Sequence, residues 1–269
     1  MADLFLRQAK NYAESRPSYP EELFEFIASK TPNHDLVWDA GTGSGQAAKS
    51  VSLSLDLCTD TSQEQLDYAP KLPNVRYQCT PPIIPMSELE SSVAPPGTVD
   101  LVTIATALHW FDLPTFYQQV KQVLKKPHGV IAAWTYTVPE ANDNITLVNE
   151  KFDAVFRQFC ADLQPYFNPA VKVVEDKYKG IDFPFEPVGY GANHTGPFEF
   201  TTERVMDLEG FLLFIKSWSA YQTAKEKGVE LLRDDVVESF KKAWSADGGD
   251  RKVVKSPIYL RIGKVGNLE

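Results

Sequence analysis

The segment DAGTGSG at residues 39–45 places a carboxylate, Asp39, two residues before the first of three glycines at alternate positions. An apolar run, LVW, precedes this segment, and a stretch with helical character follows it. Glycine has no Cβ, so its backbone allows a ligand to approach closely in a turn between a strand and a helix. The segment therefore predicts a loop that binds a nucleotide-like ligand. A tight turn at a strand end that binds nothing is the simpler alternative.

Two kinds of nucleoside ligand compete for this loop. The dinucleotide fingerprint GxGxxG requires glycine at position 46, where this chain has Gln46, and Asp39 would repel a pyrophosphate. A ligand with an ammonium group and no phosphate would be attracted by the same carboxylate, and S-adenosylmethionine has both properties. Asp60 ends the next predicted strand, where a carboxylate can accept hydrogen bonds from the ribose of either ligand. Asp39 and Gln46 therefore favour S-adenosylmethionine over NAD.

A histidine and several aromatic residues follow the fourth and fifth predicted strands. His109, Trp110 and Phe111 come directly after the fourth strand, and Trp134 and Tyr136 end the fifth. Open α/β sheets bind ligands at the carboxyl ends of their strands, so these side chains are candidates for contact with the acceptor of a methyl group. His109 could act as a general base, because the ordinary pKa of histidine is about 6.5. Each of these residues could instead belong to the core.

The elements that would position these residues alternate between short apolar runs and segments with helical spacing. We predict strands at 36–39, 53–60, 74–80, 99–108 and 129–136, and helices at 61–69 and 113–124. This alternation predicts an α/β fold with a Rossmann-like, doubly wound and mostly parallel sheet of seven strands.

The alternation stops after residue 136, and residues 139–196 are rich in Phe and Tyr. We interpret them as a helical, aromatic-rich insertion that covers the carboxyl edge of the sheet, or as an accessory packed subdomain without a ligand. Beyond the insertion we expect a strand at 198–208, an amphipathic helix at 208–224 and a closing strand at 255–265.

These elements divide the chain into three parts. Residues 1–136 would hold the N-terminal helices and the cofactor-binding core, 137–196 the insertion that covers the substrate, and 197–269 the completion of the core sheet and its helices.

Composition excludes several classes of function. The net charge of −9 disfavours binding to nucleic acid or to an anionic membrane surface. No apolar run approaches the roughly 20 residues of a membrane span, and the N-terminal segment lacks the apolar stretch of a signal peptide, so we expect a cytoplasmic protein. Three widely spaced cysteines and four histidines show no metal-ligand spacing, so we expect no metal and no disulfide framework. The expected partner is a small molecule, and the sequence does not indicate an oligomeric state.

Three motifs in order connect the chain with a known family: YAESRPSYP at 12–20, DAGTGSG at 39–45 and TALHWFD at 106–112. With these motifs the sequence resembles the class I S-adenosylmethionine-dependent methyltransferases. Within that superfamily it is most similar to the small-molecule branch typified by trans-aconitate methyltransferase and the plant embryo-abundant-like methyltransferases. The resemblance covers most of residues 10–136, SWSAYQ at 217–222 and the last strand, and is weakest at 139–196.

The resemblance implies a set of site residues. Tyr12 and Arg16 would approach the methionine end of the cofactor, and the end of the fourth strand would lie beside the transferred methyl group. Relatives have an Ala-Glu pair near the adenine after the third strand, whereas here Thr80 and Pro81 follow Cys79. The expected cofactor contacts are Tyr12, Arg16, Asp39, Ala40, Gly41, Gly43, Gly45, Asp60, Thr61, Thr80, Pro81 and Thr106. The expected acceptor contacts are His109, Trp110, Phe111, Trp134, Tyr136, Tyr166 and Trp218, with His109 as the catalytic residue.

Methyl transfer to a small carboxylic acid, which yields a methyl ester, is the function that we favour from the sequence. A carboxylate is ionised at neutral pH and needs no base, whereas a phenol or alcohol would require His109 to remove a proton. Methylation of a hydroxyl or an amine is the alternative within the same class. A nicotinamide-dependent oxidoreductase and a non-catalytic cofactor-binding protein are the alternatives from other classes.

Overall fold

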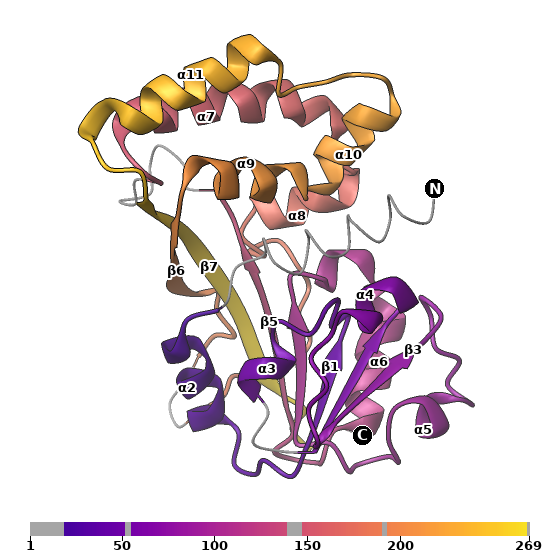
Figure 1. Cartoon of the computed structure of the whole chain (residues 1–269). Helices are drawn as coiled ribbons and strands as arrows, with labels where there is room; N and C mark the ends of the chain where they lie inside the picture. Colours follow the sequence, from indigo (N-terminus) through magenta and orange to yellow (C-terminus); the bar gives the residue numbers. More distant parts are fainter. Residues whose placement is uncertain (1–18, 52–54, 139–146, 190–192, 268–269) are drawn as a thin grey trace. The chain divides into compact units, whose positions relative to one another are not determined.

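The computed structural model describes residues 19–51, 55–138, 147–189 and 193–267. The chain divides into two units, and most of their helices and strands are labelled in Figure 1. The first, here called the sheet unit, comprises Ser18–Tyr136, Val173–Phe200 and Ile258–Glu269. The second, here called the helical unit, includes Thr137–Lys172 and Thr201–Pro257.

Seven strands form one sheet in the order β3-β2-β1-β4-β5-β7-β6. The strands are β1 (Leu36–Ala40), β2 (Leu55–Asp60), β3 (Val75–Cys79), β4 (Leu101–Ala105), β5 (Val130–Tyr136), β6 (Phe198–Met206) and β7 (Lys252–Lys264). Strands β1 to β5 pair in parallel, and β7 runs antiparallel to β5. The predicted mostly parallel, seven-stranded α/β sheet is therefore confirmed.

Helices follow most strands, as the alternating pattern predicts. They are α2 (Glu21–Lys30), α3 (Ala48–Val51), α4 (Gln63–Asp67), α5 (Leu89–Ser92), α6 (Leu113–Val123), α7 (Glu150–Leu163), α8 (Lys172–Glu175), α9 (Leu208–Lys216), α10 (Ser219–Glu226) and α11 (Asp234–Trp244). Short 3₁₀ turns lie at Leu108–Trp110, Gln164–Tyr166, Pro169–Val171 and Ser245–Asp247.

The sheet buries both faces, because successive side chains of each strand point to opposite sides. On β1, Val37 belongs to a core cluster that includes Leu23 and Ile27 of α2. The next residue, Trp38, belongs to the opposite cluster, where Phe116 of α6 packs against its ring at 5.7 Å. Helices therefore cover both faces, as a doubly wound sheet requires.

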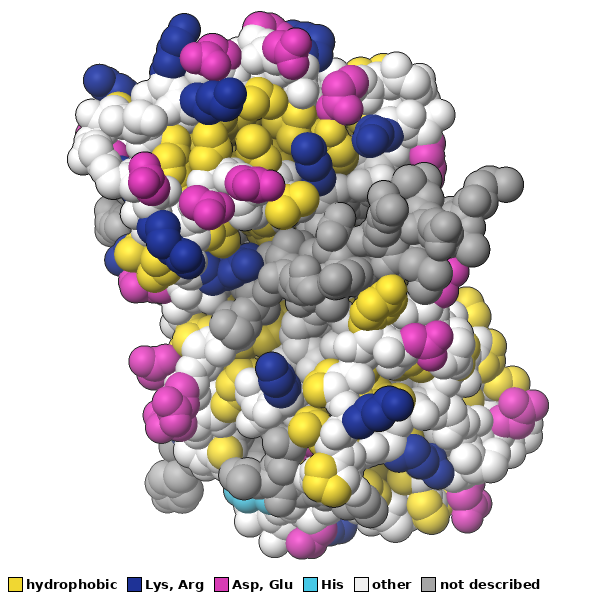
Figure 2. All heavy atoms as spheres, viewed as in Figure 1, with side chains coloured by type: hydrophobic (Ala, Val, Ile, Leu, Met, Phe, Trp, Pro, Cys, Tyr) yellow, Lys and Arg dark blue, Asp and Glu magenta, His cyan; other side chains and the backbone are white. Residues whose placement is uncertain are grey.

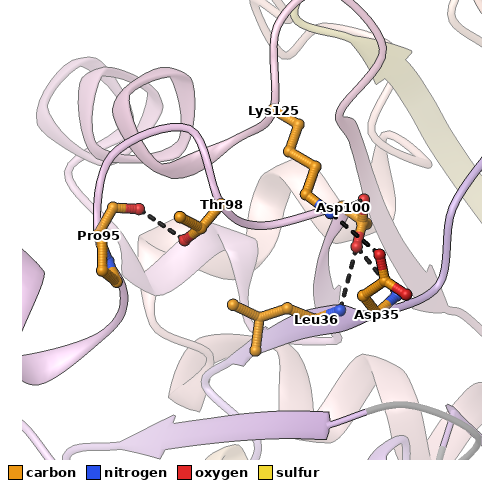
Figure 3. Close-up of polar contacts among 6 residues, drawn as sticks. All are labelled: Asp35, Leu36, Pro95, Thr98, Asp100 and Lys125. Atoms are coloured by element: carbon orange, nitrogen blue, oxygen red, sulfur yellow. Dashed lines mark hydrogen bonds and ion pairs between the residues drawn. The ribbon is translucent and has the colours of Figure 1, made fainter.

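A buried carboxylate fixes the amino ends of β1 and β4 beside each other (Figure 3). Asp100 accepts hydrogen bonds from the backbone amides of Asp35 and Leu36, at 3.0 and 3.1 Å. Lys125 pairs with Asp100 at 2.8 Å and with the exposed Asp35 at 3.3 Å. In the neighbouring turn, the hydroxyl of Thr98 donates to the carbonyl of Pro95 at 2.7 Å. Asp100 thus supplies an acceptor for both backbone amides.

The fourth strand is shorter than the sequence predicts. The expected strand at 99–108 ends as β4 at Ala105, and Thr106 then adopts a left-handed conformation with φ of 56°. A 3₁₀ turn at Leu108–Trp110 follows. The apolar residues Ala107 and Leu108 continue the pattern of a strand, but they are buried in the turn. Apolar periodicity alone cannot distinguish a strand from a buried turn.

The predicted boundary at residue 196 differs from the division that the structure shows. Residues 173–200 belong to the sheet unit, whereas 201–257 belong to the helical unit. Arg261 of β7 explains the first assignment, because its guanidinium donates to the carbonyls of Tyr178 and Ile181 at 2.9 and 3.3 Å. It also donates to the hydroxyl of Thr195 at 2.9 Å. Arg261 is a buried cation whose hydrogen-bond acceptors are far from it in the sequence. Local residue spacing therefore could not predict this role.

The helical unit has an aromatic core of its own. The ring of Phe152 on α7 packs against Phe211 of α9 at 4.9 Å and against Phe240 and Trp244 of α11 at 5.4 and 5.2 Å. Figure 1 shows α7 and α11 side by side, and the two helices pack together. The Phe-rich sequence of this region therefore forms a core, and its role as a lid stays a prediction.

The predicted helix at 208–224 is two helices. Helix α9 ends at Lys216, where the hydroxyl of Ser217 donates to the carbonyl of Phe214 at 2.6 Å. Trp218 leaves the helical conformation, with ψ of 139°, before α10 begins at Ser219. The Trp218 ring packs on Phe156 and Phe214 at 6.0 and 5.4 Å. The hydrogen bond of Ser217 and the extended conformation of Trp218 therefore interrupt the helix, although the amphipathic spacing in the sequence continues across them.

The described surface mixes charges of both signs. On the face shown in Figure 2, basic and acidic side chains are interspersed rather than gathered into a patch of one sign. Among the helices of the described residues, none is both long and apolar enough to cross a membrane.

Candidate functional site

Three glycines shape the loop that follows β1. Gly41, Gly43 and Gly45 all have positive φ, at 67°, 59° and 78°, which other residues adopt only with strain. At Gly41 a Cβ would also lie 2.7 Å from the Cβ of Ala107. Glycine at this position therefore lets the loop pack directly against the turn that follows β4. The alternate spacing of the glycines thus reflects conformation and packing as well as any room for a ligand.

Asp60 holds the glycine loop against the end of β2. Its carboxylate accepts hydrogen bonds from the backbone amides of Gly43 at 2.8 Å and Ser62 at 2.9 Å. The amide of Thr42 also donates to the carbonyl of Thr59 at 3.0 Å. Asp60, which is expected to bind the ribose, therefore lies beside the glycine loop and holds that loop in position through its hydrogen bonds.

Asp39 is a buried carboxylate with one unused oxygen. Its Oδ1 accepts a hydrogen bond from the hydroxyl of Thr103 at 2.6 Å, and its Oδ2 has no partner among the described residues. Burial raises the pKa of Asp39 to about 6, although the hydroxyls of Thr103 and Thr42 act to lower it and the charge of Asp60 adds to the rise. An unpaired buried oxygen is costly, so this atom is suited to receive a cationic group.

A second buried carboxylate, Asp56, lies on the same face of the sheet, and sequence reasoning did not identify it. Neither oxygen of Asp56 has a partner among the described residues. Burial, together with the nearby charge of Asp39, raises the pKa of Asp56 to about 7. The hydroxyl of Tyr77, on the neighbouring strand, is also buried and has no hydrogen-bond partner within the described part of the chain. This part of the sheet is therefore unusually polar for its burial.

The end of β4 contacts the segment that precedes α2. The hydroxyls of Thr106 and Tyr19 lie 3.4 Å apart, and the amide of Thr106 donates to the carbonyl of Trp134 at 2.7 Å. Tyr19 also packs edge-on against Trp134, with ring centroids 5.3 Å apart. The strained φ of Thr106 is thus held by bonds on both sides, as is common at functional sites.

His109 is half-buried in the 3₁₀ turn beyond β4. Burial lowers its pKa to about 4, so the imidazole is neutral at pH 7. The ring lies 4.6 Å from that of Trp110, and its Nδ1 lies 3.4 Å from the hydroxyl oxygen of Tyr178. A neutral imidazole has one donor and one acceptor nitrogen, so it can orient an acceptor or take a proton.

The other expected site residues of the sheet unit differ in exposure. Thr80 is buried, and its amide donates to the carbonyl of Asp60, whereas Thr61 and Pro81 are exposed. Ala40 and Trp134 are fully buried.

The aromatic residues expected to contact the acceptor also differ in exposure. Trp110 is 52% exposed, Tyr136 is half-buried, and Phe111 packs against Phe116 at 4.3 Å. Trp134 packs edge-on against Tyr19 and Phe24, and its indole nitrogen has no partner among the described residues. Of these residues, Trp110 therefore presents the largest free surface.

The remaining candidates lie elsewhere in the chain. Tyr166 and Trp218 belong to the helical unit, where Lys227 lies over the ring of Tyr166 at 5.6 Å. Tyr12 and Arg16 lie outside the described residues.

Sequence reasoning missed the partners that hold the site residues. The hydroxyl of Thr103 donates a hydrogen bond to Asp39. The hydroxyl of Tyr19 lies near that of Thr106, and the hydroxyl of Tyr178 lies near the imidazole of His109. Tyr19 falls within the motif at 12–20 and could have been found there. Thr103 is hidden in an apolar strand, and Tyr178 lies 69 residues from its partner in a segment without regular spacing.

A parallel sheet with a glycine loop after β1 and an acid at the end of β2 defines a Rossmann-like nucleoside-binding protein. Comparisons with known proteins show which family of nucleoside-binding proteins this chain resembles. Residues 38–133 match the model of a methyltransferase domain. The chain is 30% identical to a methyltransferase-family protein of Dictyostelium discoideum, in an alignment that covers 97% of this chain and 95% of the relative. An S-adenosylmethionine-dependent methyltransferase of Saccharomyces cerevisiae is 33% identical over 51% of this chain and 48% of its own length.

A solved structure agrees with these matches. A type II methyltransferase from Anaeromyxobacter dehalogenans superposes with a TM-score of 0.75 and 27% identity, over 93% of this chain and 98% of the other. The chain therefore belongs to the class I S-adenosylmethionine-dependent methyltransferases. Its cofactor is S-adenosylmethionine.

The residues of the sheet unit fit this cofactor. The unused Oδ2 of Asp39 can accept a hydrogen bond from an ammonium group, and Gly41 and Gly43 present backbone without side chains in the same loop. Among the described residues, no group of three His, Cys, Asp or Glu side chains is arranged to hold a metal ion.

Proposed function

We propose that this methyltransferase transfers the methyl group to a carboxylate oxygen of a small organic acid, which yields a methyl ester. The observation that carries the proposal is the neutral imidazole of His109 at the carboxyl edge of the sheet. A base with a pKa of about 4 removes a proton from a hydroxyl inefficiently at pH 7. A carboxylate is already ionised at that pH and requires no base.

In this proposal the chain contributes binding and orientation. Bound S-adenosylmethionine supplies a methyl group activated by its sulfonium. Asp39 would hold the ammonium of the cofactor, and Asp60 would accept hydrogen bonds from its ribose while it keeps the glycine loop in place. His109 and the exposed Trp110 would orient the acceptor. Orientation of this kind contributes up to about 7 to 11 kcal/mol in well-aligned systems.

The resemblance to the small-molecule branch supports the choice of an acid, and the net charge of −9 supports a partner other than nucleic acid or membrane. We also propose that the protein acts in the cytoplasm. Methylation of a phenol, an alcohol or an amine is the competing function within the family.

Transfer of a labelled methyl group to a panel of small carboxylic acids, phenols and amines tests the proposal. Each product is then treated with mild alkali. Label released as methanol identifies a methyl ester and supports a carboxylate acceptor. Label that resists alkali identifies an ether or a methylated amine, and would contradict the proposal.

A His109→Ala variant separates the two possible roles of the imidazole. Cofactor affinity should be unchanged, because no expected cofactor contact is removed. Transfer to a carboxylate should fall modestly, whereas a hydroxyl acceptor that needs a base should lose about 10²-fold or more. A loss of this larger size with an acid acceptor would show that His109 does more than orient the substrate.

A further inference from the structure

The hydroxyl of Tyr178 is placed to decide which nitrogen of His109 carries a proton. We propose that Tyr178 is a positioning residue. Its hydroxyl donates a hydrogen bond to Nδ1 of His109 and so holds the imidazole as the Nε2–H tautomer. His109 would then donate a hydrogen bond from Nε2 to an acceptor carboxylate. This inference rests on the proposed function, and it would account for a preference of the enzyme for acids over hydroxyl acceptors.

The side chains of Tyr178 and His109 lie within hydrogen-bond distance of each other. The oxygen of Tyr178 lies 3.4 Å from Nδ1 of His109, and both side chains belong to the sheet unit. Tyr178 is fully buried, and burial raises the pKa of its hydroxyl far above neutral pH. The phenol therefore keeps its proton and can donate it in a hydrogen bond.

Tyr178 is the donor of the hydrogen bond in this proposal, and His109 is the acceptor. Among the described residues, Nδ1 of His109 is the hydrogen-bond partner of the Tyr178 hydroxyl, and the hydroxyl of Thr135 donates instead to the carbonyl of Tyr136 at 3.4 Å. A phenol that keeps its proton donates it to an acceptor atom within reach, and Nδ1 is that atom. The proton of Tyr178 is then available to the imidazole. Nδ1 can accept it only when it carries no proton, so the remaining proton of the neutral ring lies on Nε2.

Tyr178 is held in place through its backbone. Its backbone adopts a left-handed conformation with φ of 57°, and its carbonyl accepts a hydrogen bond from Arg261 at 2.9 Å. The guanidinium of Arg261 also lies over the ring of Phe183 at 4.9 Å and bonds Thr195. A residue kept in a strained conformation by a buried cation points to a constraint beyond packing.

The tautomer determines which acceptor chemistry the site supports. An Nε2–H donates to a carboxylate oxygen and places it, but it cannot take a proton from a hydroxyl. A hydroxyl acceptor would need the opposite tautomer, with Nε2 free as a base. The pairing of Tyr178 with Nδ1 therefore favours acids over alcohols and phenols.

Nitrogen NMR of histidine-labelled protein at pH 7, without any acceptor, tests the tautomer directly. The two-bond nitrogen–hydrogen correlations of the ring distinguish Nε2–H from Nδ1–H, and a His109→Gln variant assigns the signal. We expect the Nε2–H pattern in the unaltered protein and a shift toward the other tautomer in Tyr178→Phe. An Nδ1–H pattern in the unaltered protein would overturn the proposal.

Tyr117→Phe is the matched control. Tyr117 is also buried in the same core cluster, but its hydroxyl has no partner among the described residues. Its loss should leave the His109 pattern unchanged. If both variants shift the signal alike, the effect is one of packing and the proposal fails.

Kinetics provide the second readout. Tyr178→Phe should raise KM for an acid acceptor by about 2- to 10-fold, the value of one neutral hydrogen bond, with cofactor affinity unchanged. An unchanged KM would overturn the positioning role. The spectrum does not depend on the acceptor, so alkali-stable products with an Nε2–H spectrum would refute the proposed function and leave the tautomer assignment intact.

Discussion

Two buried carboxylates on one face of the sheet, Asp39 and Asp56, have raised pKa values, chiefly because burial disfavours their charged forms. Their consequences for the protein differ. Asp39, near the end of β1, has one oxygen without a partner among the described residues and is expected to contact the cofactor, whereas no ligand is expected at Asp56. The first carboxylate should therefore affect cofactor binding as well as stability, whereas the second should affect stability alone.

Cofactor affinity should depend on pH through Asp39. The ionised carboxylate attracts an ammonium group, and with a pKa of about 6 it becomes protonated as the pH falls below that value. We expect the dissociation constant of S-adenosylmethionine to rise about tenfold between pH 7 and pH 5, measured by calorimetry. Adenosine, which lacks the ammonium, should show no such change. Equal pH dependence for both ligands would show that Asp39 does not bind the ammonium.

Stability should depend on pH through Asp56. Its pKa in the folded protein, about 7, exceeds the ordinary value of 3.8, so the folded state binds more protons between these values. The free energy of unfolding should therefore fall as the pH rises from about 4 to about 7. Asp56→Asn should remove this part of the fall and be more stable than the unaltered protein at pH 8, by about 1 to 3 kcal/mol.

Urea unfolding at pH 5 and pH 8 measures this effect. Asp67→Asn, which alters an exposed carboxylate of α4, is the control and should not be more stable than the unaltered protein at pH 8. The interpretation of Asp56 would be wrong if its variant lost stability with pH as steeply as the unaltered protein does.

At the scale of elements, Asp100 holds the amino ends of β1 and β4 together. Asp100→Ala would leave the amides of Asp35 and Leu36 without their acceptor and would break the pair with Lys125. We expect the free energy of unfolding to fall by about 1.5 to 3 kcal/mol, the range for hydrogen bonds to a charged group, in denaturant titrations.

Asp35→Ala is the matched control, since it removes an exposed partner of the same lysine at 3.3 Å. An exposed ion pair contributes at most about 1 kcal/mol, so this variant should lose much less. Similar losses in both variants would mean that the ion pair, and not the acceptors for the two amides, carries the effect.

At the scale of the whole molecule, the two units have separate cores. Phe152→Ala removes the ring that contacts Phe211, Phe240 and Trp244, and it should lower the free energy of unfolding by about 3 to 5 kcal/mol. Every expected cofactor contact among the described residues lies in the sheet unit. Cofactor affinity should therefore be unchanged at a temperature where the variant is folded.

Calorimetry of unfolding and of cofactor binding measures the two quantities on the same sample. Val205→Ala, at a side chain that is 59% exposed in the helical unit, should change neither. A loss of cofactor affinity in Phe152→Ala would show that the helical core supports the cofactor site.

Much of the sheet was predictable because hydrophobic periodicity reports local backbone structure directly. The strands that became β1, β2, β3, β5, β6 and β7 were located within a few residues. The glycines at 41, 43 and 45 indicated a loop between a strand and a helix, and the structure has such a loop between β1 and α3. Errors occurred where apolar residues continue through a change of backbone conformation. At Thr106 burial in a turn leaves the same pattern as burial in a strand, and at Trp218 the apolar spacing of a helix continues across a break between two helices.

The amino-acid sequence by itself determined the α/β sheet, the glycine loop with Asp39 and the class of cofactor, since these depend on residue type and local spacing. Tertiary structure alone decided which groups became partners: Tyr178 with His109, Arg261 with the segment around Tyr178, and the burial of Asp56. These contacts join residues up to 83 positions apart, and no local pattern encodes them. Their pKa shifts and tautomers follow from burial and from neighbours, both of which exist only once the chain has folded.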